Sequence, residues 1–238
     1  MSMNQPSNLP RIVFFDLEGT LLKKHYHLDD GLVAPSAWTL LAEKLGPECL
    51  AAENESKKVW KAGGYPTYID WMIATIDIHR RFGLTKDVFQ QLIDSAELMP
   101  GATELVSELD RAGVVTVLIT GGFKALADKV QQALRLRHSF AACDYFFDAV
   151  GRLDHWNLLP ADEAGKVDFM QLICREYKTA PEHCAFIGDG MNDVHMAREV
   201  GFSVAFNAQR ELEEVASVCV RQEVGREDLT EILRLLKR

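Results

Sequence analysis

The sequence has no long hydrophobic run, no excess of positive charge and no closely spaced pair of cysteines. No apolar stretch approaches the length of a membrane-spanning helix, and the polar stretch 1–10 lacks the apolar centre of a secretory signal. The net charge of -9 excludes an overall basic field of the kind that holds nucleic acid or an anionic membrane. We therefore expect no nucleic-acid partner, no membrane partner and a cytoplasmic location.

The cysteines are few, and their spacing matches neither a zinc site nor a redox motif. Their odd number and mostly apolar surroundings predict buried free thiols in a reducing compartment. Internal repeats and low-complexity tracts are also absent. The five cysteines are Cys49, Cys143, Cys174, Cys184 and Cys219.

What the sequence does contain is an alternation of strand-like and helix-like segments. At 238 residues, with 47% hydrophobic and 26% charged residues, it suits one soluble domain plus a smaller insertion. The alternation predicts an α/β fold with a doubly wound, mainly parallel sheet. Predicted strands are Ile12–Phe15, Val114–Ile119, Tyr145–Val150, Ala185–Ile187, Ser203–Phe206 and Val218–Val220. Predicted helices include 104–110, ended by Gly113, then Val167–Tyr177, Val194–Val200 and Leu229–Leu236.

Residues 33–97 interrupt the alternation, because they show several helical patterns and no convincing strand. Gly46-Pro47 ends the first of these helices, two aromatic-rich helices follow, and Thr85 is suited to cap a fourth. We interpret 33–97 as a small helical cap inserted after the first strand. Residues 1–32 and 98–238 then form the α/β core.

The most informative stretch is Asp16–Thr20 (DLEGT), directly after the first predicted strand. Open α/β sheets place their chemistry at the carboxyl ends of strands, so Asp16 is positioned for function. Glu18 lies two residues on, and Gly19 permits a tight turn that directs both acids into one pocket. Paired carboxylates indicate a nucleophile beside a proton carrier or a metal ligand.

Three further motifs lie at predicted strand ends or helix starts. Thr120-Gly121-Gly122 follows the second strand, where a hydroxyl and exposed backbone N–H groups would form a phosphate cradle. The stretch Gly188–Asp193 (GDGMND) supplies hard oxygen ligands of the type that suit Mg²⁺ held together with a substrate phosphate. Lys166 lies just before a predicted helix, and a lysine at this position would reach inward toward clustered carboxylates. Each signal alone is more typical of an ordinary turn or a solvated lysine, but the four in this order indicate phosphoryl transfer.

As a set, these motifs resemble the haloacid dehalogenase superfamily, and within it the branch similar to phosphoserine phosphatases. The resemblance covers about residues 11 to 207. It implies that Asp16 is a nucleophile that takes up the phosphoryl group and that Glu18 is the acid/base. It further implies that Thr120, Gly121 and Gly122 bind the phosphate oxygens while Lys166 neutralises their charge.

The resemblance also implies a Mg²⁺ cofactor and a small phosphorylated metabolite as the binding partner. Asp189 would hold the metal with the Asp16 carboxylate and the main-chain carbonyl of Glu18. Asp193 would ligate directly or through water, and Asn192 would contact the phosphate or the nucleophile. The expected activity is that of a phosphatase, a phosphoric monoester hydrolase acting through an aspartyl phosphate. The oligomeric state, monomer or homodimer, is left open.

Two positions depart from the family pattern. Glu18 stands where the family usually has Asp, although some members with phosphotransferase activity carry Glu there. A phosphotransferase and a catalytically weak phosphate-binding regulator therefore remain alternatives. Lys24 and His25 occupy the positions at which phosphoserine phosphatases place a Glu for the substrate ammonium, so phosphoserine is disfavoured as the substrate. A phosphate ester with a second anionic group, or a phosphosugar, fits these positions as well or better.

Overall fold

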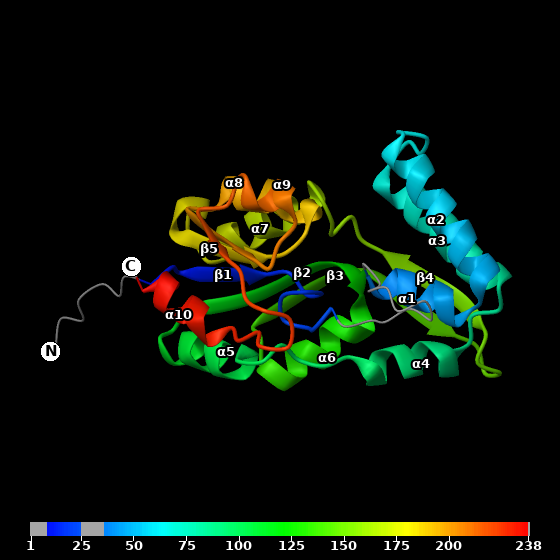
Figure 1. The fold of residues 1–238 in the computed structure, drawn as a ribbon, viewed down its shortest axis with the longest axis horizontal. Coiled ribbons are helices and arrows are strands. Elements are labelled where there is room, and N and C mark those ends of the chain that lie inside the picture. Colours follow the sequence, from blue (N-terminus) through cyan, green and yellow to red (C-terminus); the bar gives the residue numbers. More distant parts are fainter. Residues whose placement is uncertain (1–8, 25–35, 238) are drawn as a thin grey trace, which may run out of the picture.

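A seven-stranded sheet forms the centre of the molecule in the computed structural model, which describes residues 9–24 and 36–237. The strand order is β4-β3-β2-β1-β5-β6-β7 (Figure 1). Every neighbouring pair is parallel except β3 and β4, which are antiparallel. The strands are β1 (Ile12–Phe15), β2 (Val115–Phe123), β3 (His138–Phe147), β4 (Leu153–Leu158), β5 (Cys184–Gly188), β6 (Phe202–Phe206) and β7 (Val218–Val220).

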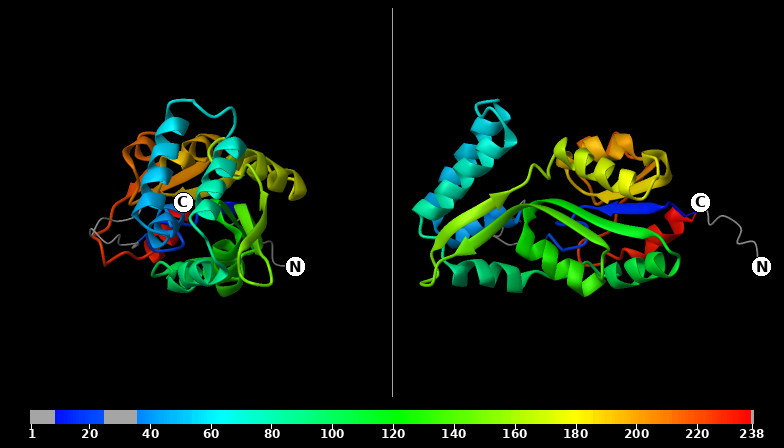
Figure 2. Two further views of the ribbon diagram at one scale, coloured as in Figure 1. Left: turned by 90° about the vertical axis from the view of Figure 1, so that its right-hand side faces the viewer. Right: turned by 180° about the vertical axis from the view of Figure 1, so that it is seen from behind.

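Helices cover both faces of this sheet, as Figures 1 and 2 show. Side chains of β1 alternate between the two faces: Val13 and Phe15 join one apolar cluster, while Ile12 and Phe14 join the other. The predicted doubly wound, mainly parallel fold is confirmed. One face carries α5 (Ala102–Arg111), α6 (Lys124–Leu134) and α10 (Thr230–Leu236), and the other carries α7 (Gly165–Glu176), α8 (Val194–Glu199) and α9 (Arg210–Glu213).

Among the described residues between β1 and α5, where the sequence predicts a helical cap, four helices are present. The side chains of Ser36, Thr67 and Thr85 each accept a hydrogen bond from a first-turn backbone N–H, which fixes three of the helix starts. Gly46-Pro47 was predicted to end the first helix, which already ends at Lys44, and Pro47 instead opens the second helix. The assignment of 33–97 as a separate domain stays a prediction. These helices are α1 (Ala37–Lys44), α2 (Pro47–Lys61), α3 (Tyr68–Arg81) and α4 (Lys86–Ser95).

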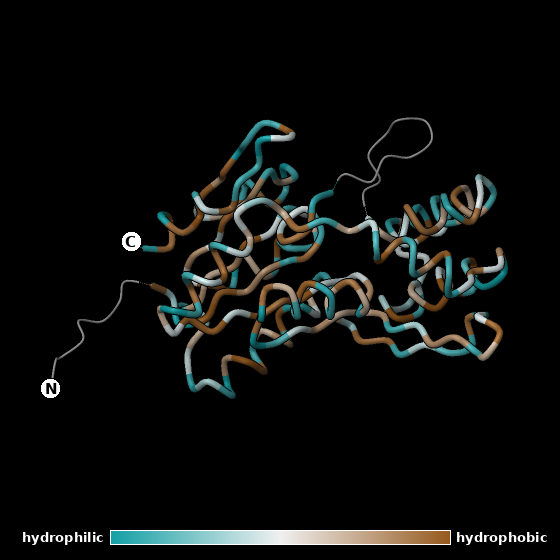
Figure 3. Tube along the Cα trace, turned by 90° about the horizontal axis from the view of Figure 1, so that it is seen from below, coloured by the Kyte–Doolittle hydropathy of each residue, from teal (hydrophilic) through white to brown (hydrophobic). Residues whose placement is uncertain are grey.

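The helices α2 and α3 stand together above the end of the sheet that β3 and β4 form (Figures 1 and 2). Along the helices, hydrophobic and hydrophilic segments alternate, as expected for elements with one buried face (Figure 3). Leu41 of α1, Ile76 of α3 and Leu92 of α4 belong to the same apolar cluster as Phe15 and Phe123 of the sheet. This shared cluster fixes the inserted helices over the carboxyl ends of the strands.

Three strand predictions need correction. The second strand continues past Ile119 to Phe123, with a register shift between Thr120 and Phe123 that absorbs the two glycines. The strand predicted for Tyr145–Val150 starts earlier, at His138, and Val150 instead lies exposed in a turn. Strand β4 was not predicted at all. A helix boundary also differs, because Lys166 lies within the first turn of α7 instead of before it.

All five cysteines are free thiols, but Cys219 is exposed, contrary to the expectation of burial. Cys174 on α7 and Cys184 on β5 lie with their sulfur atoms 3.7 Å apart, a proximity that their spacing in the sequence did not indicate. Within the described residues, no helix combines the length and hydropathy needed to cross a bilayer.

Candidate active site

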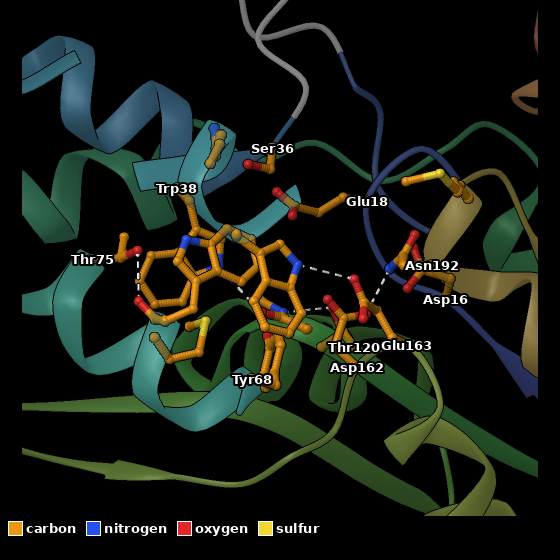
Figure 4. Close-up of a pocket in the computed structure, with 18 of the residues that line it drawn as sticks. Asp16, Glu18, Ser36, Trp38, Tyr68, Thr75, Thr120, Asp162, Glu163 and Asn192 are labelled. Carbon is orange, nitrogen blue, oxygen red and sulfur yellow. Dashed lines mark hydrogen bonds between the residues drawn. The ribbon is translucent and has the colours of Figure 1, made fainter. Parts of the chain in front are cut away.

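The carboxyl ends of β2, β1 and β5 meet at one edge of the sheet and carry most of the predicted site residues. Asp16 follows β1, Thr120 lies near the end of β2, and Asp189 follows β5. A cavity of about 700 Å³ lies between this edge and α1, α2 and α3 (Figure 4). Its volume is in the range of pockets that hold small-molecule ligands.

Lys166 is the buried centre of the charge cluster. Its ammonium group donates to Asp16 Oδ1 and to Asp193 Oδ1, both at 2.6 Å, and the residue is fully buried. Burial alone would lower the pKa of Lys166, but the carboxylates of Asp16 and Asp193 outweigh it and raise the pKa. The inward orientation predicted for this lysine is therefore observed, and the solvated alternative is excluded.

Three buried carboxylates lie close enough to share one cation. Ligand atoms of Asp16, Asp189 and Asp193 all lie within 4.8 Å of one another. Asp193 Oδ2 accepts hydrogen bonds from the backbone N–H groups of Asp189 and Gly190, both at 3.1 Å, which fixes its orientation. Burial raises the pKa of Asp189 and of Asp193, and the nearby Asp16 carboxylate adds to both shifts. Oxygen ligands in this number are the donor set that Mg²⁺ prefers.

Lys24 is a member of this cluster whose contact the sequence did not predict. Its ammonium group donates to Asp189 Oδ2 at 2.8 Å. The sequence predicted that Lys24 faces an anionic group of the substrate, with a solvated basic turn as the alternative, and gave no sign of its contact with Asp189. His25, the other residue at the position of the family's ammonium-binding Glu, lies outside the described residues.

Glu18 faces the cavity from the turn after β1 and is 9% exposed (Figure 4). Its Oε1 accepts a hydrogen bond of 2.7 Å from the backbone N–H of Ala37, at the first turn of α1. Burial raises the pKa of Glu18 to about 7, with a smaller contribution from Asp16, against the opposing effect of the Ala37 hydrogen bond. A carboxyl group with this pKa exchanges protons readily near neutral pH.

The Thr120–Gly122 segment is more internally bonded than the sequence predicted. Thr120 Oγ1 accepts a hydrogen bond of 3.0 Å from the Gly122 N–H, so that N–H is already engaged within the protein. Trp38 Nε1 donates to the Gly121 carbonyl at 3.1 Å and joins α1 to this segment. Thr120, Gly121 and Gly122 all line the cavity together with Asp16.

Asn192 is positioned through an acid that the sequence analysis missed. Its Nδ2 donates to Asp162 Oδ1 at 2.7 Å, and Asn192 lines the same cavity as Asp16. Asp162 also lies against Gly121, where a Cβ would come within 2.2 Å of Asp162 Oδ2. Burial raises the pKa of Asp162, partly offset by Lys166. An Asp in the loop before a helix looks like an ordinary surface acid, which explains the omission.

Comparison with known proteins places the chain in a family. Residues 10–201 match the model of the haloacid dehalogenase-like hydrolases, and the chain belongs to that family. It is 29% identical over 220 residues to the phosphoserine phosphatase of Archaeoglobus fulgidus, covering 90% of this chain and 57% of that protein. It is 31% identical over 156 residues to the phosphoserine phosphatase of Idiomarina loihiensis, covering 65% of this chain and 68% of that protein.

A solved structure described as a phospho-aspartyl intermediate analogue of phosphoserine phosphatase has the same fold. Its TM-score is 0.72 at 20% identity, over 95% of this chain and 99% of that chain. The chain spans less than two thirds of the length of each of the first three curated relatives. The family and the fold are thus established for residues 10–201, with the predicted resemblance confirmed.

Proposed function

We propose that this protein is a Mg²⁺-dependent phosphomonoesterase that acts on a small phosphorylated metabolite through an aspartyl phosphate on Asp16. The observation that carries the proposal is the hydrogen bond from Lys166 to Asp16, whose carboxylate lies close to those of Asp189 and Asp193. Glu18 faces the same cavity. The names of the curated relatives, which are phosphoserine phosphatases, support the reaction class.

The donor set fits the proposed metal, because three buried carboxylates converge on one point. Asp16, Asp189 and Asp193 would hold the ion. When bound, Mg²⁺ would offset the repulsion between these carboxylates and a phosphate dianion. When the ion binds Asp189, Lys24 would release that carboxylate, and its positive charge would then face the substrate.

In the first half of the reaction, a carboxylate oxygen of Asp16 forms a bond to phosphorus and the ester P–O bond breaks. Glu18 gives its proton to the departing oxygen, so the alcohol leaves neutral. Thr120 and Lys166 bind the non-bridging oxygens, where positioning and charge compensation supply most of the catalysis. The raised pKa of Glu18, about 7, keeps a proton available for this step.

In the second half, the ionised Glu18 accepts a proton from water as the water oxygen bonds to phosphorus. The bond between phosphorus and Asp16 breaks, inorganic phosphate leaves, and Glu18 is protonated again for the next cycle. A single carboxyl group thereby serves as acid and then as base. Hydrolysis consumes one water and releases one alcohol and one phosphate.

The proposal is tested by the replacement Asp16→Asn and by removal of the metal. Both are expected to lower phosphate release from phosphate esters by at least about a thousandfold, since the nucleophile or its charge compensation is lost. Asp110→Asn on the exposed surface of α5 is the matched control and should keep full activity. Undiminished turnover by Asp16→Asn would refute the proposal.

A phosphotransferase is the second candidate, favoured by Glu18 and by a cavity beside Asp16 that has room for an acceptor alcohol. Adding acceptor alcohols would then yield a phosphorylated product in place of free phosphate. Glu18→Asp should raise the share of hydrolysis if the longer side chain restrains attack by water. Release of one phosphate per chain without further turnover would instead identify a phosphate-binding regulator.

A further inference from the structure

Four aromatic side chains form one wall of the cavity, opposite the carboxylates. Trp38, Trp60, Tyr68 and Trp71 all line the same cavity as Asp16 and Glu18, and we call these four residues the aromatic wall. Figure 4 shows Trp38 and Tyr68 on the other side of the cavity from Asp16 and Asn192. An alcohol esterified to a phosphoryl group at Asp16 would therefore extend toward these rings.

The rings are held in fixed orientations before any ligand binds. Trp38 donates its indole N–H to the Gly121 carbonyl, and Trp60 donates to Glu163 Oε1 at 3.3 Å. The rings of Trp60 and Trp71 are stacked, with centroids 5.1 Å apart and planes 5° from parallel. Tyr68 meets both of them edge-on. A preorganised surface of this kind binds a flat ring with little further loss of side-chain entropy.

The aromatic wall is not simply part of the hydrophobic core. Trp60, Tyr68 and Trp71 are only half-buried, so apolar ring surface remains beside the cavity. The Nε1 atom of Trp71 is buried but has no hydrogen-bond partner among the described residues. This N–H is closed off from the cavity, so Trp71 offers a ligand its ring surface and not its N–H group.

The arrangement also distinguishes between two kinds of ligand that bind aromatic side chains. A quaternary ammonium group is held by rings that surround it on several sides. Here the largest pair, Trp60 and Trp71, is stacked face to face in parallel, which suits stacking by a further flat ring. A planar aromatic ligand is therefore favoured over a cationic one.

We propose that the preferred substrates are phosphomonoesters whose alcohol carries a planar aromatic ring, which stacks on the aromatic wall while the phosphoryl group lies at Asp16. This inference rests on the proposed phosphatase function and narrows its substrate class. The apolar contribution comes from residues of α1, α2 and α3, so it is separate from the groups that carry out the chemistry.

The first test compares 2-phenylethyl phosphate with n-propyl phosphate, both esters of primary alcohols. Because stacking on aromatic side chains favours the ester that carries a ring, kcat/KM should be about tenfold or more higher for the aromatic ester. Equal values for the two esters would overturn the inference while leaving the phosphatase intact. Faster turnover of choline phosphate than of the aromatic ester would also overturn it.

The second test compares tryptophan variants by the ratio of these two kcat/KM values. Trp71→Leu and Trp60→Leu should bring the ratio close to one, mainly by raising KM for the aromatic ester. Trp71→Phe should retain part of the preference for the aromatic ester. Trp156→Leu is the matched control, because Trp156 is also half-buried but lies on β4, outside the cavity lining. An unchanged ratio in Trp71→Leu and Trp60→Leu would refute the role of the wall.

A binding measurement separates failure of this inference from failure of the proposed function. Titration of Asp16→Asn with 2-phenylethyl phosphonate, followed by tryptophan fluorescence, reports on the aromatic wall without turnover. If neither ester is hydrolysed by folded wild-type protein, the phosphatase proposal fails. Saturable quenching that Trp71→Leu weakens and Trp156→Leu preserves would still support the wall as a ring-binding surface, and no quenching would refute it.

Discussion

At the scale of a single residue, Gly19 brings the turn after β1 into close contact with Asp189, one of the three buried carboxylates of the proposed metal site. Its φ of +84° disfavours any side chain, and a Cβ there would lie 2.3 Å from Asp189 Oδ2. We expect Gly19→Ala to displace Asp189, to abolish most phosphatase activity and to lower the free energy of unfolding by at least about 1–2 kcal/mol. Steady-state kinetics and urea denaturation would measure the two effects.

Gly113 provides the matched control, because it shares the backbone conformation without the close contact. Its φ is +78° and nothing lies within 4 Å of a Cβ built on it. Gly113→Ala should therefore lose a similar amount of stability from backbone strain and keep its activity. Full activity in Gly19→Ala would show that the position of Asp189 is not set by this close approach.

The residues of the site differ in how well the sequence reveals them. Asp16 and Asp189 could be located because each directly follows a buried apolar strand, and parallel strands bring their carboxyl ends together. The family pattern placed Lys24 near the substrate but did not reveal its contact with Asp189. Asp162 could not be located, because an inward-facing aspartate in a loop has the same local sequence as a solvated one. The raised pKa of Glu18 was also hidden, since it depends on burial beneath α1.

At the scale of elements, Lys129 of α6 joins two helices. Its ammonium group donates to the carbonyls of Ile93 at 2.7 Å and Ala96 at 3.0 Å, at the carboxyl end of α4. A cation there compensates the helix dipole and adds hydrogen bonds to the carbonyls at the end of the helix, of which that of Ile93 also accepts the Ala96 N–H. We expect Lys129→Met to lower the free energy of unfolding by about 1–2 kcal/mol, as measured by chemical denaturation.

Lys124 on the same helix is the control for loss of charge alone. It forms an exposed ion pair with Asp128 one turn along, and such pairs contribute about 0.5 kcal/mol or less. Lys124→Met should therefore be nearly neutral. Equal destabilisation by the two replacements would mean that the contacts with α4 carbonyls add nothing beyond the general effect of removing a lysine.

Strands were predictable from the sequence where hydrophobic residues run without interruption. Strands β1 and β5 meet that condition because both are fully buried. Strand β4 does not, since Leu153–Leu158 mixes charged and aromatic residues and lies at the edge of the sheet. Its pairing depends on the preceding turn, where Asp148 Oδ1 accepts hydrogen bonds from the N–H groups of Val150 and Arg152.

At the scale of the whole molecule, a buried polar network joins the inserted helices to the sheet. Glu53 of α2 pairs with Lys57 and accepts a hydrogen bond from Thr39 of α1 at 3.3 Å. Its Oε2 lies 3.7 Å from Nε2 of His79 on α3, and His79 Nδ1 lies 3.1 Å from the Tyr145 hydroxyl on β3. The Glu53 carboxylate thus joins α1, α2 and α3, and His79 extends the network to β3, a strand distant in the sequence, which no local pattern could reveal.

This network predicts a pH dependence of stability. Burial alone would raise the pKa of Glu53, but His79 and Lys57 outweigh it and lower the pKa from 4.5. A lowered pKa in the folded state stabilises the protein fully above pH 4.5, and this contribution is lost as the pH falls through the folded pKa below that value. Glu53→Gln should therefore cost about 1–3 kcal/mol at pH 7, and the difference from wild type should shrink below pH 4.5.

The comparison that isolates this effect is Glu55→Gln on the same helix. Glu55 pairs with Lys58, but both side chains are largely exposed. Chemical denaturation of both variants from pH 7 to pH 3 should show a pH-dependent difference for Glu53→Gln and almost none for Glu55→Gln. A constant difference for Glu53→Gln across that range would mean that the ionised carboxylate does not stabilise the folded state, and that the network joins the helices to the sheet through packing alone.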